Sequence, residues 1–395
     1  MKADRYRVYQ QAVEQLQQQN QLQATTTFTH GTKSQIQTRD GDEYVNFTSD
    51  DYFGLAGNKH VIESAQQYAK KYGAGSGSTR LGTGTLPCHQ ELEQTIADWL
   101  NKESALVFDS ELELYTMLMP LITDKRSVIF ADRNINDNLL QGCLSSEGSV
   151  ERYRHNELKH LEIQLKKSST ANTRLFILAE SVFRMDGDIT PVDELAEIAQ
   201  RYNAMLIIDE AHAIGVFGDK GQGLITRPKD VDMILGSFSN ALGGFGAFVA
   251  CNKVMRDYLV NYSFGFKYSA SLPPGTIGGV IKAIEQVQGM ESERKKLLEF
   301  SDLLRSGISK INRDNLTTAI DSGGPIVPLF PGDKSTTLDY AEKLNKAGYF
   351  VKPFFPLEGH EERSRINFSV NIKHRKKDIE EVVSTISKLV KESSE

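Results

Sequence analysis

The sequence predicts an α/β fold with a mostly parallel central sheet, helices on both of its faces and a smaller α+β terminal domain. Short, mainly apolar runs recur between residues 105 and 208, as expected for strands that are covered on both faces. Amphipathic helical patterns separate these runs. After about residue 275 the alternation stops and long helical patterns take over, which indicates a second, smaller unit.

The N-terminal region precedes this alternation. Residues 1–20 carry Tyr9, Val13 and Leu16 at helical spacing among many glutamines, which predicts a weakly amphipathic helix. Residues 34–47 alternate in polarity and break at Arg39-Asp-Gly-Asp42, a pattern typical of a β-hairpin. A further helix is expected over about 59–71.

Strands of the parallel sheet are expected at four places. Each is bounded by turn residues, and Pro191 precedes the helical pattern that separates the last two, near the position where a helix begins. The expected strands are 105–108, 127–130, 175–178 and 205–208.

The C-terminal part predicts helices over about 275–309, strands near 325–330 and 365–370, and a final helix over about 376–390. We therefore expect three segments. They are an N-terminal helix and hairpin that joins the small domain (1–47), a large domain (48–290) and a small α+β domain (291–395).

Composition and charge exclude several classes of function. The chain has 395 residues, of which 39% are hydrophobic and 25% charged, as in soluble globular proteins. Its net charge of −6 does not favour nucleic acid, and no apolar run reaches the roughly 18 residues of a membrane span. The N-terminus lacks a signal-peptide core, and three widely spaced cysteines suggest reduced thiols. We expect a cytoplasmic protein.

One stretch combines a buried strand, a hydroxyl-rich turn and a glycine-rich exit: Leu235-Gly-Ser-Phe-Ser-Asn-Ala-Leu-Gly-Gly-Phe-Gly246. Such turns bring backbone N–H groups and small side chains close to an anion. Upstream, Asp209-Glu-Ala-His212 follows a buried strand. The latter also spells a helicase motif, but no phosphate-binding loop of the Walker type accompanies it. No Gly-x-Gly-x-x-Gly occurs at residues 73–77, and none of the eight histidines has a partner at metal-site spacing.

These stretches and several others follow one another in an order that resembles the α-oxoamine synthases, pyridoxal-phosphate enzymes of the class II aminotransferase superfamily. The similarity extends from about residue 45 to 390. The further blocks are Asp50-Asp-Tyr-Phe-Gly-Leu55, Gly75-Ser-Gly-Ser-Thr-Arg-Leu81, Gly84-Thr-Leu-Pro-Cys-His89, Glu91-Leu-Glu93, Glu180-Ser-Val-Phe-Arg-Met-Asp-Gly-Asp188, Ser271-Leu-Pro-Pro274 and Arg363-Ser-Arg-Ile366.

The resemblance implies a fold-type-I pyridoxal-phosphate-dependent transferase whose active site lies at a dimer interface. Its family reaction is the decarboxylative condensation of an amino acid with an acyl thioester. Asp209 matches the aspartate that stabilises the pyridinium, and His212 the histidine that bonds the phenolic oxygen. Ser237 and Ser239 match phosphate donors. Asn240 stands where the family has its imine-forming lysine.

This replacement removes two chemical functions. A carboxamide nitrogen is neither nucleophilic nor basic, so Asn240 can neither form the resting imine nor take the Cα proton. Lys267 is an alternative amine, although lysines at such positions are usually surface residues.

Other positions also depart from the family pattern. The phosphate cradle after Ser110 reads Glu111 and Leu112 instead of glycine and an aromatic residue, which places a carboxylate where a phosphate should bind. Asn136 replaces the histidine that stacks on the cofactor ring. Arg184, in the block that begins at Glu180, replaces a serine. The substrate-site residues expected from the resemblance are Asp50, in place of an asparagine, and Arg363 or Arg365, which matches the carboxylate-binding arginine.

The favoured hypothesis is a non-catalytic homologue, either a pseudoenzyme or a subunit that pairs with a lysine-containing paralogue. The alternatives are an active acyltransferase of the 8-amino-7-oxononanoate synthase type and a cofactor-independent enzyme that uses Glu111, Glu113 and Asp50 as acids. The resemblance implies a homodimer or heterodimer and, as ligands, an acyl-CoA or acyl-carrier-protein and an amino acid.

Overall fold

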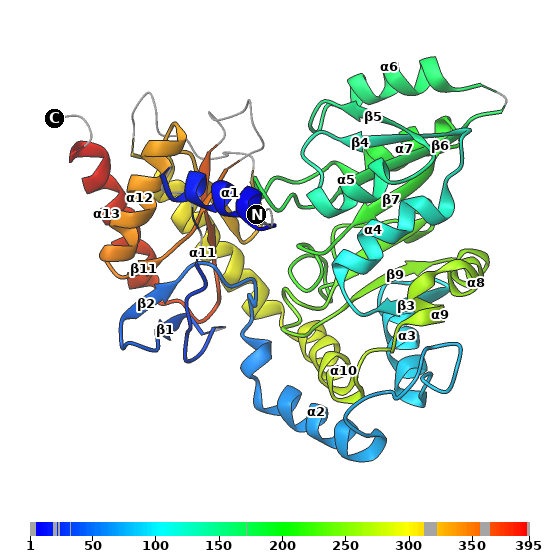
Figure 1. The fold of residues 1–395 in the computed structure, drawn as a ribbon, viewed down its shortest axis with the longest axis horizontal. Helices are drawn as coiled ribbons and strands as arrows, with labels where there is room; N and C mark the ends of the chain where they lie inside the picture. Colours follow the sequence, from blue (N-terminus) through cyan, green and yellow to red (C-terminus); the bar gives the residue numbers. More distant parts are fainter. Residues whose placement is uncertain are drawn as a thin grey trace.

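The computed structural model describes residues 5–18, 22, 24–31, 33–170, 172–311, 322–355 and 364–392. Figure 1 shows two lobes, a larger one around the central sheet and a smaller one that carries the C-terminal helices. Helix α10 (Pro274–Gln288) and helix α2 (Lys59–Tyr72) pack on each other beside the large lobe.

The central sheet has the strand order β3-β9-β8-β7-β6-β4-β5, and only β9 runs against its neighbours. The prediction of a mostly parallel sheet is confirmed, and the four expected strands fall on β3, β4, β6 and β7. The bounds are β3 (Ser104–Phe108), β4 (Ser127–Asp132), β5 (Ser149–Tyr153), β6 (Arg174–Glu180), β7 (Met205–Asp209), β8 (Met233–Ser237) and β9 (Ala247–Cys251).

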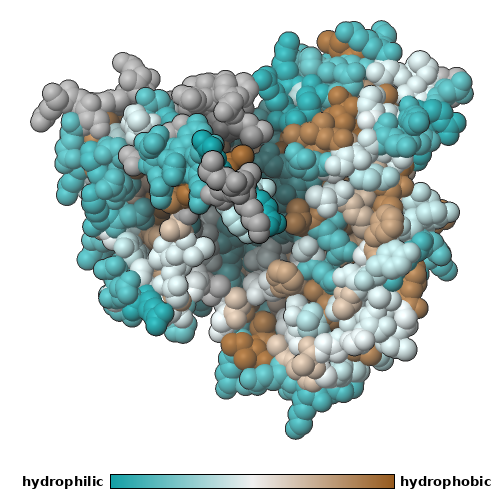
Figure 2. Space-filling view, in the orientation of Figure 1, coloured by the Kyte–Doolittle hydropathy of each residue, from teal (hydrophilic) through white to brown (hydrophobic). Residues whose placement is uncertain are grey.

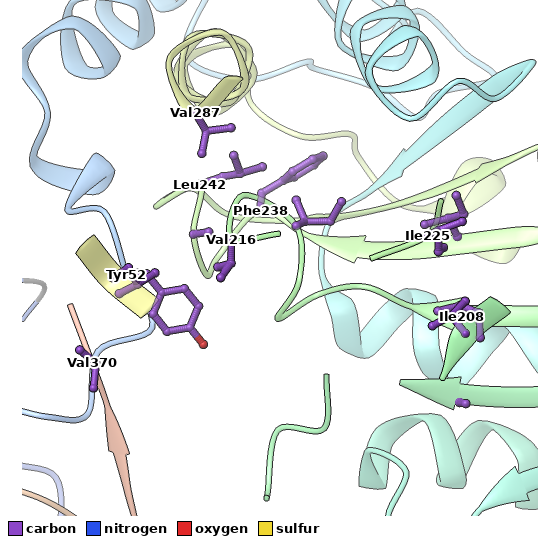
Figure 3. Packing of buried hydrophobic residues seen from close by; sticks show 14 of the residues in the cluster. Tyr52, Ile208, Val216, Ile225, Phe238, Leu242, Val287 and Val370 are labelled. Carbon is purple, nitrogen blue, oxygen red and sulfur yellow. The ribbon is translucent and has the colours of Figure 1, made fainter. Parts of the chain in front are cut away.

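Both faces of this sheet are covered, as the apolar runs predict. Ile208 faces one buried cluster together with Val216, Phe238 and Val287, and its neighbour Ile207 faces the other, because successive side chains of a strand point to opposite faces. Figure 3 shows part of the first cluster. The covering helices are α3 (Pro87–Trp99), α4 (Glu111–Ile122), α5 (Asp137–Leu144), α6 (Leu158–Ser168), α7 (Val192–Arg201), α8 (Lys253–Tyr262) and α9 (Phe264–Tyr268).

The small lobe combines two three-stranded sheets with three helices. The expected hairpin forms from β1 and β2, and β2 pairs with β11, so the N-terminal segment joins the C-terminal one. The strands expected near 325–330 and 365–370 are β10 and β13. The bounds are β1 (Gln35–Gln37), β2 (Glu43–Asn46), β10 (Ile326–Leu329), β11 (Tyr349–Phe350), β12 (Pro353–Phe354), β13 (Arg365–Ser369), α11 (Glu291–Ser309), α12 (Lys334–Lys346) and α13 (Lys376–Glu392).

The N-terminal helix forms as expected, as α1 (Arg7–Gln18), but it buries none of its residues. Its apolar positions Tyr9, Val13 and Leu16 are all exposed. Two short 3-10 helices, Leu55–Gly57 and Pro228–Asp230, complete the described chain. Within these ranges, no helix has the length and apolar character that crossing a bilayer requires.

Candidate active site

Two buried carboxylates end the central strands of the large lobe. Glu180 and Asp209 are register partners at the ends of β6 and β7, and both are almost inaccessible to solvent. Burial raises the pKa of Asp209 to about 7, although its Oδ1 accepts a 2.8 Å hydrogen bond from the Ala211 amide. Burial and the neighbouring Asp209 raise the pKa of Glu180 well above its usual range. The charge of Asp209 therefore disfavours the ionised form of Glu180.

His212 lies beside this pair and contacts a tyrosine that the sequence reasoning did not single out as a site residue. The Nδ1 atom of His212 is 2.9 Å from the Tyr52 hydroxyl, and both residues are buried. Burial lowers the pKa of His212, so its neutral form is favoured. Figure 3 shows the Tyr52 ring at the edge of the buried cluster. Tyr52 belongs to the block Asp50-Asp-Tyr-Phe-Gly-Leu55, which the resemblance had already placed at the site. Its position in that block was the signal that could have found it.

The hydroxyl-rich turn after β8 and the start of α4 come together, as the resemblance implies. The Ser237 and Ser239 hydroxyl oxygens are 2.6 Å apart, and the Ser239 hydroxyl donates a 2.9 Å hydrogen bond to Glu111 Oε1. Ser110 caps α4 by accepting from the Glu113 amide. A helix N-terminus favours an anion, and here the protein's own carboxylate at Glu111 occupies that environment. The adjacent Leu112 side chain is exposed.

The Asn240 side chain is turned toward the strand-end turn. Its Nδ2 atom donates a 3.0 Å hydrogen bond to the Ala211 carbonyl, and the residue is buried. The backbone can pass close by because Gly243 has a φ of 59°, and a Cβ atom there would lie 2.3 Å from the Ala56 nitrogen. The carboxamide thus serves to hold two turns together.

Two further departures from the family pattern have different environments. Asn136 caps α5, since its Oδ1 accepts from the Asn138 amide, and its own amide donates to Glu180. The Arg184 amide also donates to Glu180, at 3.3 Å, but its side chain is exposed. The positive charge of Arg184 contributes to the low pKa of His212, which places the guanidinium within electrostatic reach of that ring.

The expected substrate-site residues already have protein partners. Asp50 Oδ1 accepts a 2.6 Å hydrogen bond from the Ser369 hydroxyl. Arg365 is buried, forms an ion pair with Asp186 and lies with its guanidinium carbon 5.1 Å from the centroid of the Phe330 ring. Arg363 lies outside the described residues.

A cavity of about 350 Å³ lies between the small lobe and Arg184. Figure 2 shows the molecule hollowed between its two lobes. Asp50 and Arg184 are the two predicted site residues in its wall. The remaining lining residues are Thr26, Phe28, Thr48, Ile326, Phe350, Lys352, Phe354, Asn367 and Ser369.

The sequence reasoning missed one charged cluster, in which ligand-type atoms of His155, Asp186 and Asp188 lie within 4.8 Å of one another. Sequence spacing hides it, because His155 precedes Asp188 by 33 residues. The His155 ring bridges Asp132 and Asp188 at 2.8 and 2.6 Å. Burial lowers the pKa of His155, but these two carboxylates outweigh it and raise the pKa to about 10. His155 therefore carries a positive charge between two carboxylates, while the buried Asp188 Oδ1 atom has no hydrogen-bond partner among the described residues.

The three acids of the cofactor-independent hypothesis have separate partners. Glu111 accepts from Ser239, Asp50 accepts from Ser369, and Glu113 Oε2 accepts from the Asp109 amide at 3.2 Å. No hydrogen bond joins any two of these three side chains. The alternative amine, Lys267, lies in α9 with its Nζ atom 5.9 Å from the Tyr262 ring centroid.

Comparison with known proteins decides the family. Residues 42–386 match the model of the aminotransferases of class I and II. A protein of Desulfosudis oleivorans with the provisional name 8-amino-7-oxononanoate synthase is 36% identical over 344 residues, which cover 87% of this chain and 88% of that protein. The chain belongs to the α-oxoamine synthase family. A Pasteurella multocida protein with the same provisional name is 33% identical over 97% of this chain and 99% of its own length.

Solved structures support the same fold. Serine palmitoyltransferase of Sphingomonas wittichii superposes with a TM-score of 0.90 at 20% identity, covering 100% of this chain and 99% of that one. The 8-amino-7-oxononanoate synthase of Francisella tularensis superposes with a TM-score of 0.77 at 23% identity, over 89% and 99% of the two chains. The α-oxoamine synthase homologue described here therefore has the fold-type-I transferase architecture that the sequence predicts.

Proposed function

We propose that this α-oxoamine synthase homologue has lost pyridoxal-phosphate catalysis and acts as a pseudoenzyme or as a non-catalytic subunit. The observation that carries the proposal is the hydrogen bond from Ser239 to Glu111 at the N-terminus of α4. The resemblance places the cofactor phosphate at this position. A dianionic phosphate there would meet a carboxylate at close range, and repulsion between like charges costs several kcal/mol in a partly dry site. The residues present do not fit the cofactor.

The missing lysine alone would not carry this proposal. A lysine-to-alanine variant of serine palmitoyltransferase, which superposes here with a TM-score of 0.89 at 20% identity, was solved with a bound pyridoxal-phosphate–myriocin aldimine. In the present chain Asn240 is hydrogen-bonded to Ala211, and Glu111 is hydrogen-bonded to Ser239. We infer that the cofactor would find neither an amine for the imine nor an uncharged site for its phosphate.

The acidic strand ends support the same view. The family aspartate stabilises a pyridinium cation, and a cation beside Asp209 would keep that carboxylate ionised. In this chain burial, together with the nearby charge of Glu111, raises the pKa of Asp209 to about 7.

We also propose that the chain forms a homodimer, or a heterodimer with a lysine-containing paralogue. Exposed aromatic residues along α8 and α9 support a protein contact, because contiguous exposed apolar surface marks interaction sites. They are Tyr258, Tyr262, Phe264 and Tyr268. Residues 1–47, 48–290 and 291–395 are proposed as the units of each subunit. The buried free thiols of Cys88, Cys143 and Cys251 support a cytoplasmic location.

The alternative is an active acyltransferase of the 8-amino-7-oxononanoate synthase type that uses an acyl-CoA or acyl-carrier-protein and an amino acid. The names of the relatives favour it, as does the retention of Asp209 and His212 at the strand end.

Absorbance spectroscopy of purified protein titrated with pyridoxal phosphate separates the two functions. We expect no imine band, and no release of CoA when an acyl-CoA and amino acids are added. A clear imine band, or CoA release that depends on the amino acid, would overturn the proposal. Copurification with a lysine-containing paralogue would identify a subunit, whereas a stable homodimer would identify a stand-alone pseudoenzyme.

A further inference from the structure

Two cationic side chains line the cavity beside the small lobe. Arg184 and Lys352 both line it, and among the described residues neither side chain forms an ion pair. The acid in the wall, Asp50, accepts a hydrogen bond from Ser369. The lining therefore carries one net positive charge, since Arg184 and Lys352 stand against Asp50 alone.

Three phenylalanine side chains, Phe28, Phe350 and Phe354, form the aromatic part of the lining. Phe28 and Phe350 pack edge to face with ring centroids 4.8 Å apart, and Phe354 lies in the same wall. The segment with Phe28 is fixed to β1, because the Thr29 amide donates to the Gln37 carbonyl at 2.9 Å. Such a wall suits a hydrocarbon group.

We propose that this cavity binds a monocarboxylate with a compact hydrocarbon body. The carboxylate would lie between Arg184 and Lys352, and the hydrocarbon would pack on Phe28, Phe350 and Phe354. A volume of about 350 Å³ falls within the roughly 300–1,000 Å³ of small-molecule pockets. The guanidinium group offers a planar fork that matches a carboxylate.

The charge balance selects the class of ligand. A single negative charge neutralises the lining. A phosphate dianion would exceed it and approach Asp50, and a zwitterionic amino acid would leave the cavity positively charged. An amine with the same hydrocarbon group would be repelled by Arg184 and Lys352. These comparisons define the test.

Isothermal titration calorimetry with 3-phenylpropanoate provides the first measurement. We expect saturable binding that weakens with salt, and at least tenfold weaker binding of 3-phenylpropylamine, inorganic phosphate and L-phenylalanine. Equal or tighter binding of L-phenylalanine or phosphate would overturn the assignment of the ligand class. The absence of saturable 3-phenylpropanoate binding would overturn the site.

Variants locate the binding. Arg184→Ala and Lys352→Ala should each weaken 3-phenylpropanoate binding about tenfold, as expected for a lost charge-assisted contact. Lys166→Ala removes the same charge from the exposed end of α6 and should leave binding unchanged. Asp50→Asn keeps an oxygen for Ser369 and should tighten binding, because it removes the opposing charge. Equal losses in the Lys166 and Lys352 variants would contradict the proposal.

The test is independent of the proposed loss of catalysis. No cofactor takes part in the titration, and the imine band is read separately. Binding of the carboxylate together with an imine band would contradict only the pseudoenzyme proposal, and the absence of both would contradict only the cavity proposal.

Discussion

The start of α4, where Ser239 meets Glu111, and the cavity beside the small lobe differ in how their charged groups are neutralised. We call the first of these regions the anion seat. At the seat, Glu111 bonds Ser239 and Asn240 bonds the Ala211 carbonyl, so the polar groups are satisfied by the protein itself. In the cavity, Arg184 and Lys352 find no ion-pair partner among the described residues. A site that satisfies itself has little to offer a charged ligand, whereas a cavity with unneutralised cations does.

The same contrast divides two arginines near the lobe boundary. Arg365 is buried and paired with Asp186, while the Arg184 side chain is exposed in the cavity wall. The resemblance implied that Arg365 receives a substrate carboxylate. In the structure its partner is the carboxylate of Asp186, so we expect Arg365 to contribute to stability and Arg184 to binding.

The largest expected effect tests this pair of arginines. Arg365→Met should lower the free energy of unfolding by about 3–5 kcal/mol, because it removes the guanidinium that neutralises the buried Asp186 carboxylate. Arg184→Met should change the same quantity by less than about 0.5 kcal/mol, as for an exposed residue. Denaturant unfolding of both variants provides the measurement. Similar losses in the two variants would remove the distinction.

A smaller effect concerns the buried acid at the strand end. The folded-state pKa of Asp209 is about 7, raised from 3.8, so between about pH 4 and pH 7 the folded chain binds a proton that the unfolded chain does not. The stability from this protonation is present at low pH and is lost as pH rises through that window.

The variant Asp209→Asn should therefore raise the free energy of unfolding at pH 8 by about 1–3 kcal/mol and flatten its decline from pH 5 to pH 8. Unfolding curves at both pH values provide the measurement, with the exposed Asp257→Asn as control. A loss of stability in Asp209→Asn at pH 8 would mean that a cation stabilises the carboxylate, as in a site that keeps its cofactor.

The smallest effect separates the consequence of the missing lysine at residue 240 from that of the carboxylate at Glu111. Asn240→Lys alone should show little imine with pyridoxal phosphate, and adding Glu111→Ala should tighten cofactor binding at least about tenfold by removing the opposing charge. Glu113→Ala on the Asn240→Lys background is the matched control, because Glu113 bonds the Asp109 amide instead of the seat. An equally strong imine band in Asn240→Lys alone would show that the seat still accepts phosphate.

Most of the fold could be predicted from local pattern, and the exceptions have physical reasons. Strands β4, β6 and β7 lie inside the sheet and are apolar on both faces, so their runs are conspicuous. Strand β5 was missed because its residues are exposed in alternation, so that it has no continuous apolar run. The helix α1 was predicted, but nothing in its own pattern indicated that Tyr9 and Val13 would be exposed.

By itself the sequence determined the α/β class, the family and the identity of the changed residues, including Asn240 and Glu111. These follow from the periodicity of burial and from residue types at matched positions. Only the tertiary structure decided which groups meet. The strand order brings Ser239 to Glu111, 128 residues away, and Arg365 to Asp186, 179 residues away. Local sequence cannot specify such pairs. A charged residue has the same local sequence pattern whether its partner in the folded protein is another residue or a ligand.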